Sequence, residues 1–94
     1  MRKKSAKAPK VARLGARKPR TPTEAERRFL EQLGASIKAA RLARSTTAQR
    51  LAEAVGITLA PQYNREAGRV SMPVEDIYRY AIALRISPRD LLPE

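Results

Sequence analysis

The chain has 94 residues, of which 20 are Lys or Arg and nine are Asp or Glu, and its formal net charge at pH 7 is +11. It contains no Cys and no His, which excludes disulfide frameworks, thiolate chemistry, zinc fingers and histidine-based catalysis. Aromatic residues make up only 4% of the chain, which argues against a base-stacking RNA platform, and no apolar run approaches the roughly 20 residues of a membrane span.

The basic charge is concentrated at the N-terminus. Residues 1–20 carry nine of the Lys and Arg and no acid, whereas residues 21–94 carry eleven basic and nine acidic residues. Pro9 and Pro19 interrupt any helix there, so we expect a disordered basic arm over 1–20 and one folded domain over 21–94. Such an arm indicates a polyanionic partner, most simply double-stranded DNA, and the alternative is a solubilising tail. We expect a cytoplasmic protein, with an organelle transit peptide as the alternative for the arm.

The first predicted helix starts at a capping signal. Thr21 is a candidate cap, Pro22 suits the first helical position and Glu24 completes a capping box. The helix is predicted to run to about Arg44, with a possible bend at Gly34. Its apolar stripe consists of Phe29 or Leu30, Leu33, Ile37 and Ala40.

Two short helices are predicted to follow. Residues 48–55 have helical apolar spacing, with Thr47 as the cap and Gly56 as the stop signal. Three residues then lead to a third helix that begins near Leu59 and stops at Gly68. Two short helices joined this tightly are typical of a helix-turn-helix motif.

A fourth helix begins at Pro73, and its apolar stripe consists of Val74, Ile77, Ala81 and Leu84. Tyr78 and Ile82 form a second apolar face, which is either additional core or a dimer surface. A capped turn over residues 87–92 supplies a fifth short helix. The prediction is therefore an all-α, five-helix domain.

Residues 33–92 resemble the phage repressor and Cro-like helix-turn-helix family, also called the XRE family, over about two thirds of the chain. The residues that carry the resemblance are Leu33-Gly34, Ile37, Arg41, Ala43-Arg44, Thr47, Leu51-Ala52-Glu53, Val55-Gly56-Ile57-Thr58, Glu66-Ala67-Gly68 and residues 81–87. The resemblance implies a five-helix domain that binds a partly palindromic operator as a dimer, with the third helix in the major groove.

The third helix departs from the family pattern. The ungapped match puts Gln62 and Arg65 where family members usually bury aliphatic side chains, and an unpaired buried Arg would cost several kcal/mol. We therefore favour a rotated third helix that buries Tyr63 and turns a polar stripe toward DNA, where Gln can read adenine and Arg can read guanine. The stripe consists of Thr58, Gln62, Arg65 and Arg69.

The unrotated orientation is the alternative. In it the base-reading residues are Leu59, Ala60 and Asn64, with Asn64 the only polar one. A third possibility is that Gln62 and Arg65 are solvated surface residues in a domain that does not bind DNA.

The resemblance also implies supporting residues. Arg41 and Glu66 stand where family members often form an ion pair that holds the recognition helix at its angle; the alternative is two solvated charges. Thr47 is a candidate phosphate contact, as are Arg69 and Ser71 in the loop after the third helix. Thr47 and Ser71 can equally serve as caps alone.

These observations predict a sequence-specific transcriptional regulator, most simply a repressor, that binds double-stranded DNA as a homodimer. The alternatives are an antitoxin that binds a toxin partner and represses its own operon, and a non-specific nucleic-acid-binding protein that uses the basic arm. No enzyme, cofactor, metal or membrane partner is expected, because the usual catalytic constellations cannot be assembled from these residues. The dimer interface is predicted at Tyr78, Ile82 and Leu92.

Overall fold

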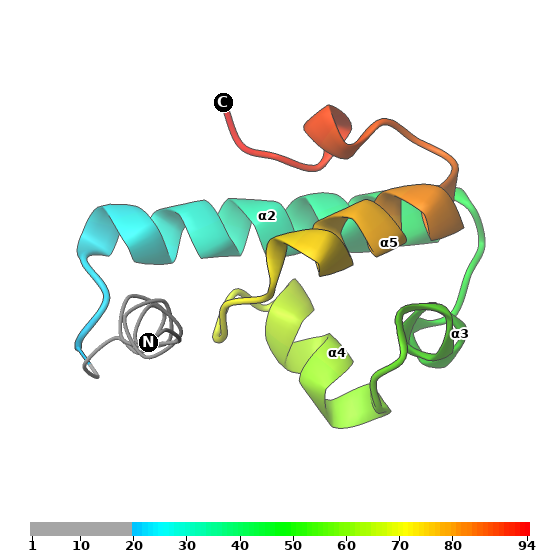
Figure 1. The fold of residues 1–94 in the computed structure, drawn as a ribbon, viewed down its shortest axis with the longest axis horizontal. Coiled ribbons are helices and arrows are strands. Elements are labelled where there is room, and N and C mark those ends of the chain that lie inside the picture. Colours follow the sequence, from blue (N-terminus) through cyan, green and yellow to red (C-terminus); the bar gives the residue numbers. More distant parts are fainter. Residues whose placement is uncertain (1–19) are drawn as a thin grey trace, which may run out of the picture.

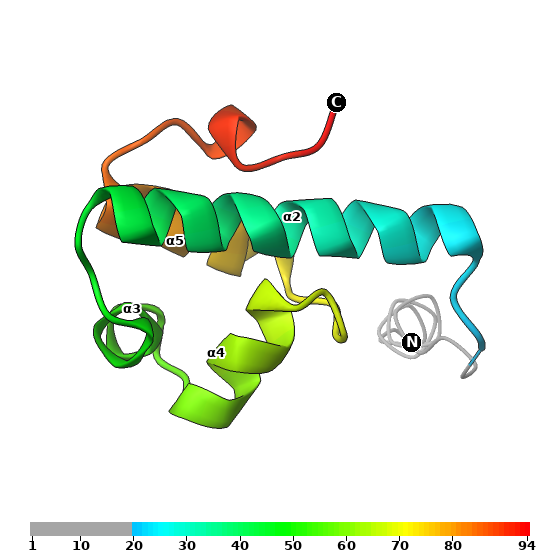
Figure 2. The same ribbon diagram turned by 180° about the vertical axis from the view of Figure 1, so that it is seen from behind.

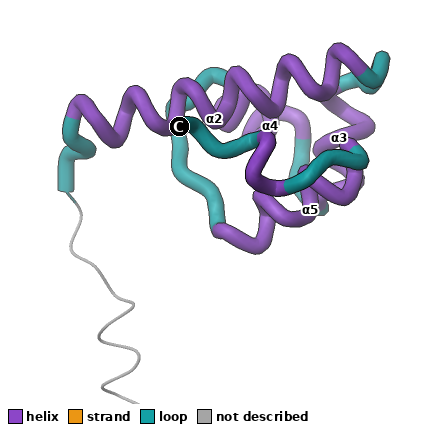
Figure 3. Tube along the Cα trace, turned by 90° about the horizontal axis from the view of Figure 1, so that it is seen from above, coloured by secondary structure: helices purple, strands orange, loops and turns teal. Residues whose placement is uncertain are grey.

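The computed structural model describes residues 20–94, so the basic arm predicted over 1–20 lies outside the described residues except for Arg20. In the described part all secondary structure is helical, with no strand (Figure 3). The elements are α2 (Glu24–Ala43), α3 (Ala48–Val55), α4 (Leu59–Glu66), α5 (Val74–Leu84) and the 3₁₀ turn η1 (Pro88–Asp90). The all-α class is confirmed, although the fifth predicted helix is a single 3₁₀ turn.

The long helix α2 and the helix α5 run side by side, and α3 and α4 lie together on one side of this pair (Figures 1 and 2). After α5 the chain passes through η1 on the opposite side. No helix within residues 20–94 is long and apolar enough to cross a membrane. The core is formed by Leu33, Ile37, Leu51, Val55, Tyr80, Ala81, Leu84 and Leu91.

The start of α2 differs from the prediction by two residues. Thr23, not Thr21, is the N-cap, and its hydroxyl accepts a hydrogen bond from the backbone N–H of Glu26 at 3.0 Å. The Glu26 carboxylate accepts one from the backbone N–H of Thr23 in return, also at 3.0 Å. The capping box is therefore present, but with Glu26 in place of Glu24.

Gly34 lies in the middle of α2, and the helix continues through it. The expected bend is not needed to explain this glycine, because Gly34 is buried where α4 crosses α2. A Cβ atom at this position would collide with the carbonyl oxygen of Arg65 and would lie 2.5 Å from that of Glu66. The missing side chain lets the last turn of α4 approach the backbone of α2.

Replacing Gly34 with Ala tests this close approach. Helix propensity alone would favour Ala by about 1 kcal/mol, but overpacking against backbone atoms that cannot move aside typically costs about 1 to 3 kcal/mol. We expect Gly34→Ala to lower the free energy of unfolding, measured by urea denaturation. Ala35→Gly, at the exposed neighbouring position, calibrates helix propensity and should cost about 1 kcal/mol. A more stable Gly34→Ala protein would contradict the packing described here.

The buried face of α5 follows the predicted stripe except at its first position. Ala81 and Leu84 are buried and Ile77 packs against the core, but Val74 is exposed, and Tyr80 takes a core position that was not predicted. Tyr78 and Ile82 are 59% and 60% exposed, so the prediction that they add to the core is wrong. Tyr80 can occupy the core because its hydroxyl finds a buried hydrogen-bond partner on α4.

Candidate nucleic-acid interface

Helices α3 and α4 form the helix-turn-helix unit. Thr47 caps α3, and its hydroxyl accepts a hydrogen bond from the backbone N–H of Arg50 at 3.1 Å. Gly56 ends α3 in the left-handed conformation, with φ of +94°, a conformation that favours glycine. Only Ile57 and Thr58 separate Gly56 from the first residue of α4, so the predicted tight connection is confirmed. Thr58 stands at the N-cap position of α4, but its side chain makes no capping hydrogen bond.

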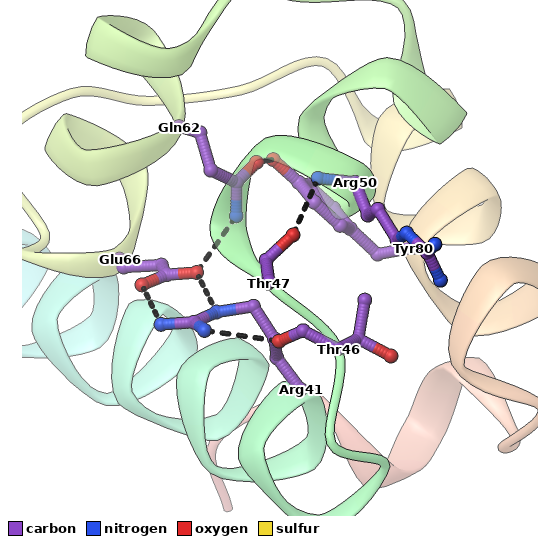
Figure 4. A network of polar contacts seen from close by, with 7 residues as sticks. All are labelled: Arg41, Thr46, Thr47, Arg50, Gln62, Glu66 and Tyr80. Atoms are coloured by element: carbon purple, nitrogen blue, oxygen red, sulfur yellow. Dashed lines mark hydrogen bonds and ion pairs between the residues drawn. The ribbon is translucent and has the colours of Figure 1, made fainter.

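The inner face of α4 is polar, and its groups are paired with one another (Figure 4). The Glu66 carboxylate accepts hydrogen bonds from Nε of Arg41 at 2.8 Å and from its Nη2 at 3.1 Å. Arg41 also donates from Nη1 to the carbonyl oxygen of Thr46 at 3.1 Å. The hydrogen bonds from its guanidinium to Glu66 raise the pKa of Arg41, so Arg41 keeps its positive charge. Arg41, on α2, is thereby bonded both to α4 and to the segment that precedes α3.

The same carboxylate continues the network toward α5. Nε2 of Gln62 donates to Oε2 of Glu66 at 2.8 Å, and the Tyr80 hydroxyl donates to Oε1 of Gln62 at 2.7 Å. Burial raises the pKa of Tyr80, so its hydroxyl keeps the proton that it donates. Gln62 has no exposed surface, and both ends of its side-chain amide are hydrogen-bonded.

Arg65 is held inward as well. Its Nη1 lies 2.9 Å from Oδ2 of Asp76 at the start of α5, and both side chains are largely buried. The guanidinium also makes a long contact of 3.5 Å with the Tyr80 hydroxyl, and its carbon atom lies 6.0 Å from the centre of that ring. Arg65 is therefore paired with a carboxylate on the next helix.

These contacts overturn the rotated orientation of the third helix. Gln62 and Arg65 face the interior, and Tyr63, which that orientation buries, is 53% exposed. The physical reason is that the buried polar groups have partners, so burial does not carry the penalty that an unpaired Arg would. The partners Tyr80 and Asp76 come from α5, and the spacing of residues within the third helix does not reveal them. The sequence did contain a signal for this orientation. The ungapped family match directs Gln62 and Arg65 inward, and two buried polar residues require polar partners on a neighbouring helix.

The outer face of α4 is the surface left for a ligand, and most of its side chains are small or apolar. Only two of them, Tyr63 and Asn64, carry side-chain hydrogen-bonding groups. Asn64 is partly exposed, and its Oδ1 accepts a hydrogen bond from Nη1 of Arg69 at 3.2 Å. The residues of this outer face are Leu59, Ala60, Tyr63, Asn64 and Ala67.

Exposed hydroxyl and cationic groups flank this face. Thr47 and Arg50 lie at the start of α3, Thr58 precedes α4, and Arg69 and Ser71 follow it. Arg50 is an exposed cation in the first turn of α3 that the sequence analysis did not select. These groups can donate hydrogen bonds to phosphate oxygens, which position a protein on DNA without reading its sequence. Within residues 20–94 no acidic cluster could hold a metal ion.

Solved structures of transcriptional regulators share this fold. The restriction-modification controller protein C.AhdI from Aeromonas hydrophila is 27% identical, with a TM-score of 0.64 over 67% of this chain and 96% of that chain. The clp gene regulator ClgR from Corynebacterium glutamicum is 28% identical, with a TM-score of 0.65 over 67% of each chain. The described part of the chain therefore has the helix-turn-helix fold of these regulators, in agreement with its resemblance to the phage repressor and Cro-like type.

A third structure shows likeness in fold alone. It is a hypothetical transcription factor, NHTF, from Neisseria, with 19% identity and a TM-score of 0.66 over 83% of this chain and 87% of that chain. Comparisons with protein-family models and with curated proteins find no match.

Replacing Tyr80 with Phe tests the buried network. The change removes the donor to Oε1 of Gln62 and leaves a buried acceptor unsatisfied, which costs about 1 to 3 kcal/mol of unfolding free energy. Tyr78→Phe removes an exposed hydroxyl from the same helix and should change stability by no more than about 0.5 kcal/mol. Chemical denaturation of the two variants gives the comparison, and equal effects would show that the Tyr80 hydroxyl is not part of a buried network.

Proposed function

We propose that the chain is a sequence-specific DNA-binding transcriptional regulator, most simply a repressor, that places the outer face of α4 in the major groove. The single observation that carries the proposal is the arrangement of α4. Its inner face is held against α2 and α5 by buried polar contacts, and its outer face is exposed between phosphate-binding candidates on α3 and in the following loop. A rigidly held helix with one free face suits the reading of base edges.

The phosphate contacts in this proposal come from the groups that flank α4. The Thr47 hydroxyl accepts from the α3 backbone and still has its own proton to donate to a phosphate oxygen. The Thr58 side chain makes no capping bond and is free to donate in the same way. Arg50, Arg69 and Ser71 complete the set, and the net charge of +11 favours a polyanionic partner.

Selection of bound sequences from a random duplex pool tests the function. A regulator should enrich a partly palindromic consensus and prefer it by about 10³-fold or more over random DNA. A pool with no enriched sequence would reject the proposal in favour of non-specific nucleic-acid binding.

Asn64 is the polar base reader in this proposal, in place of Gln62 and Arg65. Its side-chain amide can donate one hydrogen bond to an acceptor on a base edge while Arg69 holds the oxygen, and this single bond should discriminate less than the bidentate pair that is worth about 1 to 3 kcal/mol. Asn64→Ala should relax sequence preference at one position in each half-site, with little change in stability. Gln32→Ala, an exposed amide on α2, is the matched control. An unchanged consensus for Asn64→Ala, measured by repeating the selection, would contradict this role.

We place the homodimer interface on the exposed face of α5. Tyr78 and Ile82 lie one turn apart on that face, and with Ala54 and Arg79 they line a shallow hollow between α3 and α5. Leu92, after η1, is a further exposed apolar side chain. A symmetric pair would carry two copies of α4 to two half-sites, which is why a palindromic operator is part of the proposal.

The dimer surface is tested by adding a charge to it. Ile82→Arg should shift the protein toward monomer in sedimentation equilibrium, because it places a cation in an apolar contact, and should weaken binding to a two-half-site duplex. Leu42→Arg is the control, because Leu42 is 58% exposed, against 60% for Ile82, and lies on α2. An unchanged association constant for Ile82→Arg would place the interface elsewhere.

A further inference from the structure

The first turn of α4 exposes side chains that have no hydrogen-bonding atoms. Leu59 is 37% exposed and Ala60 is exposed, and both come directly after Thr58 at the start of the helix. The polar groups of the outer face, Tyr63 and Asn64, lie one turn further along. The end of α4 that carries Leu59 and Ala60 can therefore read a base only through carbon contacts.

Carbon contacts select one feature of the major groove. The four base pairs differ there in their donors and acceptors, and thymine alone among the bases also presents a 5-methyl group. An apolar side chain gains when it covers that methyl group, and it loses when it covers a donor or acceptor that it cannot pair. Apolar side chains such as those of Leu59 and Ala60, placed against base edges, would therefore favour thymine over the other bases.

The inner face of α4 cannot supply a polar substitute. Exposing Gln62 or Arg65 to a base would require α4 to turn about its axis, which would break the bonds to Tyr80 and Asp76. The backbone contact at Gly34 holds the last turn of the helix against α2. The carbon-rich face is consequently the one that the proposed function turns toward the groove.

We propose that α4 recognises the 5-methyl groups of thymines through Leu59 and Ala60, so that each half-site is identified in part by methyl groups. The inference rests on the proposed function and specifies which chemical group of the operator α4 recognises. Covering one methyl-sized group contributes about 0.8 kcal/mol, which corresponds to about fourfold in affinity. By the same chemistry 5-methylcytosine, which carries its methyl group at the same place in the groove, binds better than cytosine at these positions.

Deoxyuridine tests the proposal on the unaltered protein, because it differs from thymidine only by lacking the methyl group. The probe is the duplex recovered by selection, with each thymine of one half-site replaced in turn. We expect deoxyuridine to lower the affinity about fourfold at one or two positions. In a second duplex, a cytosine–guanine pair replaces the thymine–adenine pair at such a position. There 5-methylcytosine should bind about fourfold better than cytosine. A consensus without thymine, or a site indifferent to all these replacements, would overturn methyl reading while specific binding stands.

Two variants assign the effect to α4. Leu59→Ala should reduce the deoxyuridine penalty at one position toward onefold, and Leu42→Ala, which removes an exposed leucine from α2, should leave it at about fourfold. Circular dichroism of both variants checks that each is folded. If the penalty is unchanged in Leu59→Ala, Leu59 does not read the methyl group. If the protein shows no sequence preference at all, the proposed function fails, and the methyl inference fails with it.

Discussion

The carboxylate of Glu66 is the centre of the contacts that orient α4. One of its oxygens accepts hydrogen bonds from both Arg41 and Gln62, each at 2.8 Å, and Gln62 in turn accepts one from Tyr80. A buried ion pair contributes little net stability against an apolar replacement, but removal of one partner typically costs about 3 to 5 kcal/mol. The network therefore acts mainly as a constraint, because any rotation of α4 would leave several of its groups buried and unpaired.

This constraint decides which side chains are available for binding. With Gln62, Arg65 and Glu66 directed inward, α4 keeps two hydrogen-bonding side chains, Tyr63 and Asn64, on its outer face. The proposed regulator would therefore read DNA with few polar contacts to bases and with phosphate contacts from neighbouring segments. Because most polar side chains of α4 make buried contacts, few remain to bond with base edges. We therefore assign part of the recognition to thymine methyl groups.

Local signals in the sequence predicted most of the helix boundaries. Thr47 and Gly56 bound α3 as expected, because a cap and a left-handed stop depend on adjacent residues. The start of α2 was ambiguous, since Thr21 with Glu24 and Thr23 with Glu26 have the same spacing, and only the folded structure selects the second pair.

The orientation of α4 could not be obtained from its own residues. The partners that make burial of Gln62 and Arg65 acceptable, Tyr80 and Asp76, are more than ten residues away, and helical spacing does not show which face of α5 meets them. The exposure of Tyr63, Tyr78 and Ile82 has the same origin, because it follows from how helices pack and not from their individual patterns.

The side-chain amide signals of Gln62 and Asn64 test the orientation of α4 most directly. In a nitrogen–proton correlation spectrum recorded during a titration with the selected duplex, the Asn64 amide should shift. The Gln62 amide should be protected from exchange with water and should stay in place, because its groups are bonded to Glu66 and Tyr80. A Gln62 amide that exchanges freely and shifts on DNA addition, beside an unchanged Asn64, would contradict the orientation described here.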